Sequence, residues 1–193
     1  MTPEDDRGRR RRAELVAAGV ALLAESGWEG LTHRAVAARA QANPGLVHYY
    51  FNGTRGLRLA VAAEAIEGSI GAVFEGILSS ADDDELVGNI ARLLTSVRGD
   101  AAAGRLSAEL VSATFGDPEI GDLVRREFAE GRRGLENWLR SHHPSWRLGR
   151  ARSTAAVITA MIDGLVLHLL LDPDLRVREI VQTTRQLVAQ LLQ

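Results

Sequence analysis

Four ring-bearing side chains, His48, Tyr49, Tyr50 and Phe51, stand together in the segment NPGLVHYYFNG (43–53). The chain has four Phe, three Trp and two Tyr residues, so this segment holds a third of its aromatic side chains. Neighbours in a helix point about 100° apart, so one short helix cannot bury all four rings on one face. We expect Tyr50 and Phe51 to pack inward and His48 and Tyr49 to face outward. Exposed Tyr hydroxyl and His ring N–H groups can bond phosphates, and their ring edges can pack on sugars or thymine methyls.

Helix signals lie on both sides of this segment. Asn43 followed by Pro44 predicts a helix start, and Asn52-Gly53 predicts its end. Thr32 is the expected N-cap of another short helix just before it. Two short helices joined by a tight turn, and braced by a longer helix from Arg9, form a helix-turn-helix. Its second helix enters the major groove of DNA.

The longer first helix has its own stop signal. Its apolar residues recur at spacings of three and four, at Leu15, Val16, Gly19, Leu22 and Leu23. Gly27 stands where a left-handed residue ends a helix, and Trp28 where a hydrophobic contact follows the cap. Residues 1–8 are expected to be a disordered polar start. The arginine run 9–12 is either an arm that contacts DNA, with Arg10 as its representative, or a solvated helix start.

The rest of the chain shows helical signals and no alternation of period two, so the predicted fold is all-α. The expected domains are the helix-turn-helix at 9–55 and a larger helical ligand-binding and dimerisation domain at 56–193. The further helices are expected at about 54–79, from the acids at 82–85 to Gly99, 101–114, 118–139, 147–171 and 175–192.

Charge and composition narrow the function. All 23 basic residues are Arg. Residues 1–58 hold nine Arg and six acids, net +3, whereas residues 59–193 hold fourteen Arg and nineteen acids, net −5. A basic head on an acidic body suits a nucleic-acid reader, although chance imbalance on solvated helices is the alternative. Cysteine is absent, so disulfides and thiolate metal sites are excluded. No unbroken apolar run reaches membrane-spanning length and no signal peptide is evident, so we expect a cytoplasmic protein without membrane contact.

The segment LTHRAVAARAQANPGLVHYYFNGTRGL (31–57) resembles the DNA-binding signature of tetracycline-repressor-like (TetR-family) regulators. ALLAESGWEGLT, just upstream, is similar to that family's link between its first two helices. The resemblance implies a double-stranded DNA operator as partner. The positions that match DNA-contacting positions are Thr32, His33, Arg34, Pro44, Gly45, Leu46, His48, Tyr49, Tyr50 and Thr54.

Three positions depart from the family pattern. Gln41 stands where the turn usually has Gly, and a left-handed non-Gly residue costs about 1–2 kcal/mol. His48 stands where Tyr is usual. Thr54 stands where a phosphate-binding Lys is usual, so Arg55 is the expected replacement.

For the remaining two thirds, the resemblance implies a pocket for a small-molecule effector and a homodimer interface. Residues 151–171 are apolar on more than one face, which favours helices from a second subunit as partners. The passage IDGL…LLLDP is similar to a subgroup that includes choline-responsive repressors, which does not assign choline as ligand. Candidate ligand contacts are Asn89, Leu93, Val97, Glu109, Phe115, Phe128, Trp138 and Met161. Asp163 is either a further polar contact or an interface residue.

The resulting hypothesis is a dimeric transcriptional regulator, most simply a repressor that a ligand releases from a palindromic operator. An activator is the alternative within that class. A helical small-molecule-binding or scaffold protein without DNA binding is the alternative outside it. No phosphate-binding glycine loop, H-E-x-x-H or G-x-S-x-G motif occurs, so we expect neither an enzyme nor a cofactor. The pair His142-His143 lacks a third ligand nearby, so a metal site is not expected.

Overall fold

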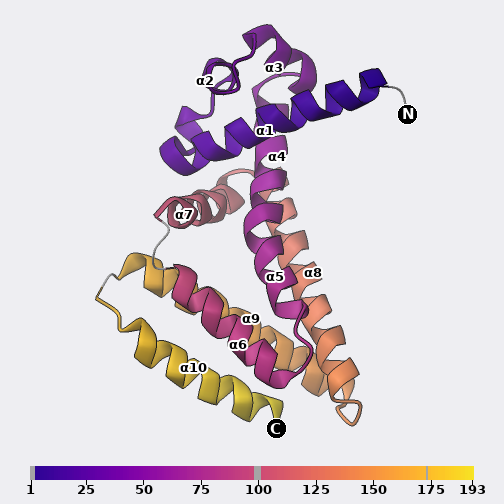
Figure 1. Cartoon of the computed structure of the whole chain (residues 1–193), viewed down its shortest axis with the longest axis vertical. Helices are drawn as coiled ribbons and strands as arrows, with labels where there is room; N and C mark the ends of the chain where they lie inside the picture. Colours follow the sequence, from indigo (N-terminus) through magenta and orange to yellow (C-terminus); the bar gives the residue numbers. More distant parts are fainter. Residues whose placement is uncertain (1–2, 98–100, 173) are drawn as a thin grey trace. The chain divides into compact units, whose positions relative to one another are not determined.

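The computed structural model describes residues 3–97, 101–172 and 174–193, and every regular element within these ranges is helical (Figure 1). The predicted all-α fold is therefore confirmed. In chain order the elements are α1 (Pro3–Gly30), α2 (His33–Arg39), α3 (Pro44–Phe51), α4 (Thr54–Ile66), the π-helical segment η1 (Glu67–Gly71), α5 (Ala72–Leu78), α6 (Asp83–Ser96), α7 (Ala101–Gly116), α8 (Pro118–His142), α9 (Leu148–Leu171) and α10 (Val177–Leu192).

The first helix begins earlier than the sequence analysis expects. Residues 3–8, expected to be disordered, form the first turns of α1. Pro3 suits the first position of a helix, because the amide hydrogen that it lacks would have no partner within the helix there. The arginine run continues this helix, in which Arg11 pairs with Glu14 (Nη1–Oε2 2.6 Å) and Arg9 with Asp6 (Nη2–Oδ1 3.0 Å).

The chain forms two compact units, and each unit consists of two separate stretches of sequence. One unit comprises Met1–Ser69 and Arg105–Arg125, and the other comprises Ile70–Gly104 and Arg126–Gln193. The boundaries fall inside η1, α7 and α8. This division differs from the expected boundary between residues 55 and 56, because part of α7 and the start of α8 pack with the N-terminal helices.

In the first unit, α1 packs on α2 and α4, and α3 packs on both α2 and α4. Its fully buried side chains include Leu15, Leu23, Val36, Val47 and Leu57. Gly19 permits the close approach of α1 to α4, because a Cβ there would lie 2.4 Å from Val61 Cγ2. This packing holds α2 and α3 in a fixed arrangement.

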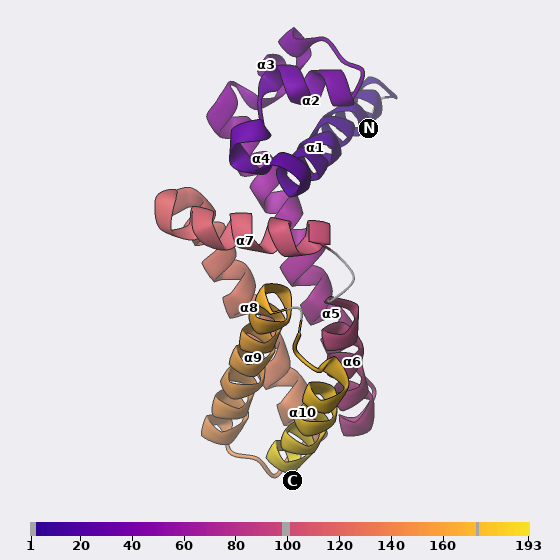
Figure 2. The same ribbon diagram turned by 90° about the vertical axis from the view of Figure 1, so that its left-hand side faces the viewer.

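In the second unit, α6 packs on α5, α9 and α10, and Figure 2 shows α6, α9 and α10 next to one another. The core here includes Leu86, Ile90, Leu94, Leu135, Leu139, Ile158 and Val188. Asp82 caps α6, since its Oδ1 accepts a hydrogen bond from the Glu85 N–H at 2.8 Å. The expected helix start at this acid cluster is therefore confirmed.

Within the described ranges, α9 is the one helix long and apolar enough to cross a membrane, with a mean hydropathy of 2.0. Such a segment was not expected from the sequence, in which no unbroken apolar run reaches membrane-spanning length. Length and composition alone are weak indicators, since core helices of water-soluble proteins meet the same criterion. One third of the apolar window is already buried inside this unit.

Candidate DNA-binding and ligand-binding sites

Side-chain caps fix both helices of the predicted helix-turn-helix. Thr32 Oγ1 accepts a hydrogen bond from the Ala35 N–H at 3.1 Å, and Asn43 Oδ1 accepts one from the Gly45 N–H at 2.8 Å. Asn52 ends α3 in the left-handed conformation, with φ 51°. These ends match the sequence prediction because each cap involves residues only two to four positions apart.

The turn between α2 and α3 keeps a left-handed residue without glycine. Gln41 has φ 49°, and its carbonyl accepts a hydrogen bond from Arg11 Nη2 at 3.0 Å. The Ala42 N–H donates to the Ala37 carbonyl at 2.8 Å. Arg11 thus links α1 to the turn, a role that the sequence analysis did not foresee for the arginine run.

The rings of α3 divide as predicted. Phe51 is buried and Tyr50 is half-buried, whereas His48 is exposed and Tyr49 is 78% exposed. Arg12 lies over the inner side of this helix, with its guanidinium carbon 5.3 Å from the centroid of the Phe51 ring. The outer side of α3 therefore presents two hydrogen-bonding rings to solvent.

The other residues implied in DNA binding lie mostly at exposed positions. Exposed are Arg10, Thr32, Arg34, Pro44, Gly45, Thr54 and Arg55, and half-buried are His33 and Leu46. The His33 ring lies edge-on to that of His48, with centroids 6.0 Å apart, which joins the start of α2 to α3. Among the described side chains, His33 Nε2 is shielded from solvent and lacks a hydrogen-bond partner.

Arg55, the expected phosphate contact, is engaged by a carboxylate. Its Nη2 lies 2.7 Å from Glu119 Oε2, and its Nε donates to the same oxygen at 2.8 Å. The hydrogen bond and charge of Glu119 raise the pKa of Arg55. A DNA phosphate would have to compete with Glu119 for this guanidinium.

Glu109 has a different environment from the one expected of a ligand contact. Its backbone carbonyl accepts a hydrogen bond from Trp28 Nε1 at 3.0 Å, and its Oε2 accepts one from the Trp28 N–H at 3.4 Å. The Arg58 guanidinium lies 4.5 Å from the centroid of the Trp28 ring. Arg105 Nε donates to the Ala24 carbonyl at 2.9 Å. Part of α7 is therefore bonded to the end of α1.

Trp28 and Phe115 also differ from expectation. Gly27 has the predicted positive φ, 65°. Trp28 was expected to contact its own helix, and its indole N–H also donates a hydrogen bond to Glu109 on α7. Phe115 is 89% exposed, so it is not part of an enclosed wall. It shares an outer side of α7 with Val111, four residues earlier and 56% exposed.

The six remaining ligand candidates all belong to the second unit and have packing or hydrogen-bonding roles there. Leu93, Val97 and Met161 pack against the core. The Phe128 ring meets Phe74 edge-on at 6.3 Å. Asn89 Nδ2 donates to Ser80 Oγ at 2.8 Å, and the buried Trp138 donates from Nε1 to the Ser80 carbonyl at 2.8 Å.

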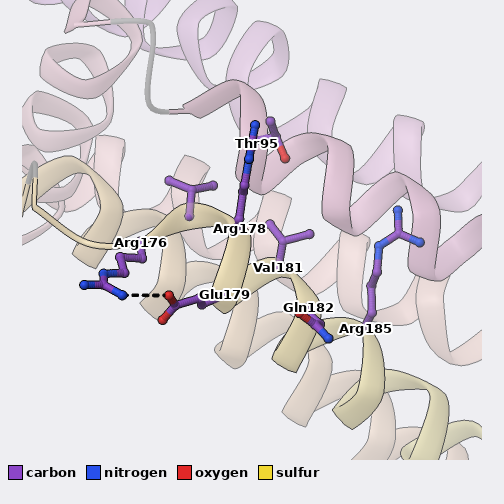
Figure 3. Close-up of a pocket in the computed structure, with 8 residues that line it drawn as sticks. Thr95, Arg176, Arg178, Glu179, Val181, Gln182 and Arg185 are labelled. Carbon is purple, nitrogen blue, oxygen red and sulfur yellow. Dashed lines mark hydrogen bonds and ion pairs between the residues drawn. The ribbon is translucent and has the colours of Figure 1, made fainter.

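Two surface hollows of the second unit carry opposite charge. One, of about 720 Å³, lies between α6 and α10 and is lined by Thr95, Arg176, Val177, Arg178, Glu179, Val181, Gln182 and Arg185 (Figure 3). The other, of about 490 Å³, lies between α5 and α8 and is lined by Gly71, Phe74, Glu75, Leu78, Ser79, Glu127, Glu130 and Gly131. Neither is lined by the eight candidates named from the sequence. The first hollow had one signal in the sequence, namely the spacing of Arg178 and Arg185, which are seven residues apart and so share one face of a helix.

The two histidines at the end of α8 make separate contacts. His142 Nε2 lies 3.1 Å from the Ala81 carbonyl, and its ring stacks on Trp138. His143 Nε2 lies 3.0 Å from Asp83 Oδ1. Across the ranges that the structure describes, no three His, Asp or Glu side chains are grouped to hold a metal ion.

Comparison with known proteins assigns both parts of the chain. Residues 15–61 match the profile of bacterial regulatory proteins of the tetR family, and residues 83–193 match that of the BetI-type transcriptional repressor C-terminal domain. No curated protein sequence matches the chain.

Solved structures of the same fold cover nearly the whole chain. The protein SCO7518 from Streptomyces coelicolor A3(2) is 25% identical, with 95% of this chain and 98% of that chain covered and a TM-score of 0.73. The multidrug binding protein EbrR, complexed with proflavin, is 27% identical, with 94% and 99% covered and a TM-score of 0.65. SCO1917, a TetR-family member from Streptomyces coelicolor A3, is 26% identical, with 94% and 97% covered and a TM-score of 0.66. The capped helix-turn-helix, the all-helical body and these matches together show that the chain belongs to the TetR family of transcriptional regulators and carries a BetI-type C-terminal domain.

Proposed function

We propose that this regulator is a homodimeric repressor that holds a palindromic operator through α3 and releases it when a small molecule binds. The observation that carries the proposal is the outer side of α3, where His48 and the 78% exposed Tyr49 lie on a helix fixed by caps at both ends. Rings held on a rigid helix lose little entropy on binding, which suits recognition of a major groove. The exposed Thr32 and Arg34 at the start of α2 are the proposed phosphate contacts beside them.

A dimer is supported by the exposed side of α9. Val157, Leu167 and Leu171 are 50%, 54% and 71% exposed, and their spacing places them on one face together with Ala160 and Gly164. An apolar stripe along four turns of a helix is unusual on an isolated surface. A second copy is the partner that gives two-fold symmetry, and two-fold symmetry matches a palindromic operator with one α3 in each half-site.

Binding of a small molecule, the first step of the proposed release, is supported by one relative. EbrR is a multidrug binding protein solved with imidazole, proflavin and malachite green. We propose that the second unit of this chain takes a small molecule in the same way. Its proposed contacts are Leu93, Val97, Phe128 and Met161. Each is only partly buried, so a small displacement of the helices would let a ligand reach it. The ligand would favour a state in which the two α3 helices no longer match major grooves about 34 Å apart.

The test of DNA binding is fluorescence anisotropy with the DNA upstream of the protein's own coding region, across a salt series. We expect tight specific binding, with a log–log salt slope steeper than about −5 for a dimer that makes six or more phosphate contacts. The double variant H48A/Y49A should lose at least about tenfold in affinity, as expected when base contacts are removed. F115A, which trims another exposed ring on α7, is the control and should retain wild-type affinity.

The DNA-binding results distinguish the proposed repressor from a helical protein that does not bind DNA. Weak binding that is indifferent to sequence and to H48A/Y49A, on this DNA and on sites selected from genomic fragments, would favour a helical ligand-binding or scaffold protein. Malachite green, titrated into the protein–DNA complex, tests release. Operator affinity that stays unchanged while the dye demonstrably quenches the tryptophan fluorescence of the protein would contradict release by that class of ligand.

A further inference from the structure

The hollow between α6 and α10 has the composition of a site for an anion with an apolar body. Its lining holds three arginines and one glutamate, a net charge of +2. By sequence, the region from residue 59 onward is net acidic, so a cationic hollow stands out against its surroundings. The hollow between α5 and α8 shows the contrast, since its charged lining residues are three glutamates.

The three arginines of the hollow differ in whether their side chains have an ion-pair partner. Arg176 pairs with Glu179, Nη1 to Oε1 at 3.0 Å, which is the dashed contact in Figure 3. Within the described parts of the chain, Arg178 and Arg185 have neither a hydrogen-bond nor an ion-pair partner. In Figure 3 both side chains extend from α10 toward α6, Arg178 beside Thr95. Two like charges on one helix face repel each other. A bound anion would attract both guanidinium groups and offset that repulsion.

Spacing and apolar lining define the kind of anion. Arg178 and Arg185 are seven residues apart, about 10.5 Å along the helix axis, with Val181 and Gln182 on the same face between them. Val177 and Val181 line the hollow and pack partly buried against the core, which gives it an apolar floor. A volume of about 720 Å³ lies within the usual range for small-molecule sites.

From this arrangement we infer that the hollow between α6 and α10 binds a small organic anion. Its carboxylate or sulfonate would be held by Arg178 and Arg185 and its apolar body would lie over Val177 and Val181. Guanidinium groups suit this role because they donate two parallel hydrogen bonds to a planar carboxylate. Leu187, on the opposite flank of the buried stripe of α10, is a 46% exposed apolar side chain. The proposed anion site lies on α6 and α10, whereas the proposed dimer surface lies on the exposed side of α9.

The test is a titration of the full-length protein with the fluorescent anion 1-anilinonaphthalene-8-sulfonate, compared with the uncharged N-phenyl-1-naphthylamine, which has the same aromatic body. The double variant R178Q/R185Q should weaken binding of the sulfonate about fivefold or more, because charge-assisted hydrogen bonds are lost. Binding of the uncharged probe should stay within about twofold, because the apolar floor is intact.

The matched control is R140Q/R147Q, which removes two exposed arginines of the same unit that lie outside the hollow. It should bind both probes as the wild type does. An equal loss in this control, an equal loss for the uncharged probe, or no effect of R178Q/R185Q would each overturn the site, as would a wild type that does not bind the sulfonate. The inference does not depend on DNA binding. H48A/Y49A should bind the sulfonate normally, so failure of the DNA reader and failure of this site are separate results.

Discussion

The indole N–H of Trp28 donates a hydrogen bond to the backbone carbonyl of Glu109 across 3.0 Å, joining residues 81 positions apart in the chain. The Trp28 N–H adds a longer bond to the carboxylate of the same residue. Gly27 makes room for it, because a Cβ there would lie 2.5 Å from Glu109 Oε1. Through this residue pair, α7 is bonded to the segment that leads into α2.

The substitution W28F should lower the free energy of unfolding by about 1 kcal/mol beyond the loss of ring area, because it removes the hydrogen bond that the indole N–H donates to the Glu109 carbonyl. W146F is the matched control. Trp146 stacks on His143 and lies 3.9 Å under the Arg150 guanidinium, and its indole N–H makes no hydrogen bond within the described residues. Urea unfolding of both variants measures the difference. Equal losses would show that the bond to Glu109 contributes nothing.

Releasing Arg55 from Glu119 should strengthen DNA binding. In E119Q the guanidinium loses its charged partner and becomes available to a phosphate, so operator affinity should rise a few-fold. The log–log salt slope should steepen by about 0.9 per added phosphate contact. E25Q is the control, because it removes the same charge from another exposed pair, in which Arg39 meets Glu25 at 2.6 Å. A gain in both variants would indicate a general charge effect, and a loss in E119Q would mean that Glu119 holds Arg55 in its binding position.

A glutamate in the exposed stripe of α9 should dissociate the proposed dimer. L167E would place an unpaired charge in an apolar interface, which costs several kcal/mol, so light scattering should find a monomer. L148E is the control on the same helix. Leu148 is exposed to a similar extent, 46% against 54%, but it lies well away from the stripe around the helix axis. Dissociation by both substitutions, or by neither, would contradict the proposed interface.

Asp163 should make stability depend on pH. Asp163 is exposed on one side, but partial desolvation on α9 raises the pKa of its carboxyl from 3.8 to about 6, an effect that Arg132 partly offsets. Between these two values the folded state retains a proton that the unfolded state has lost, so stability falls as the pH rises from about 4 to 6 and is constant above. Because the side chain keeps contact with solvent, we expect the loss to be about 1 kcal/mol.

The measurement is thermal unfolding of the wild type and D163N between pH 4 and 8. D163N removes the ionisation, so the variant should match the wild type near pH 4. It should unfold about 2–4 °C higher at pH 7, as about 1 kcal/mol implies for a chain of this size. The reverse order, with D163N less stable at pH 7, would show that the ionised carboxylate has a favourable partner.

The elements that the sequence determined are those encoded by neighbouring residues. Helix ends were predicted at Thr32, Asn43 and Asn52. A cap joins residues only two to four positions apart, so a short stretch of sequence is enough to predict it. The inward and outward rings of α3 followed from the angle between successive residues of a helix. The resemblance placed Gln41 where the turn usually has Gly and left open whether the turn is reshaped. The structure shows that Gln41 keeps the left-handed backbone and accepts a hydrogen bond from Arg11.

Tertiary structure alone decided which polar groups meet across long stretches of chain. Glu109 was expected to face a ligand and instead bonds Trp28, and Arg55 was expected to be free for phosphate and instead pairs with Glu119, 64 positions away. Phe115 was expected in a pocket wall and is exposed. An apolar or charged residue type fixes which kinds of neighbour are favourable. Which neighbour it actually receives depends on how α7 and α8 pack with α1 and α4 in the first unit, and no local pattern encodes that packing.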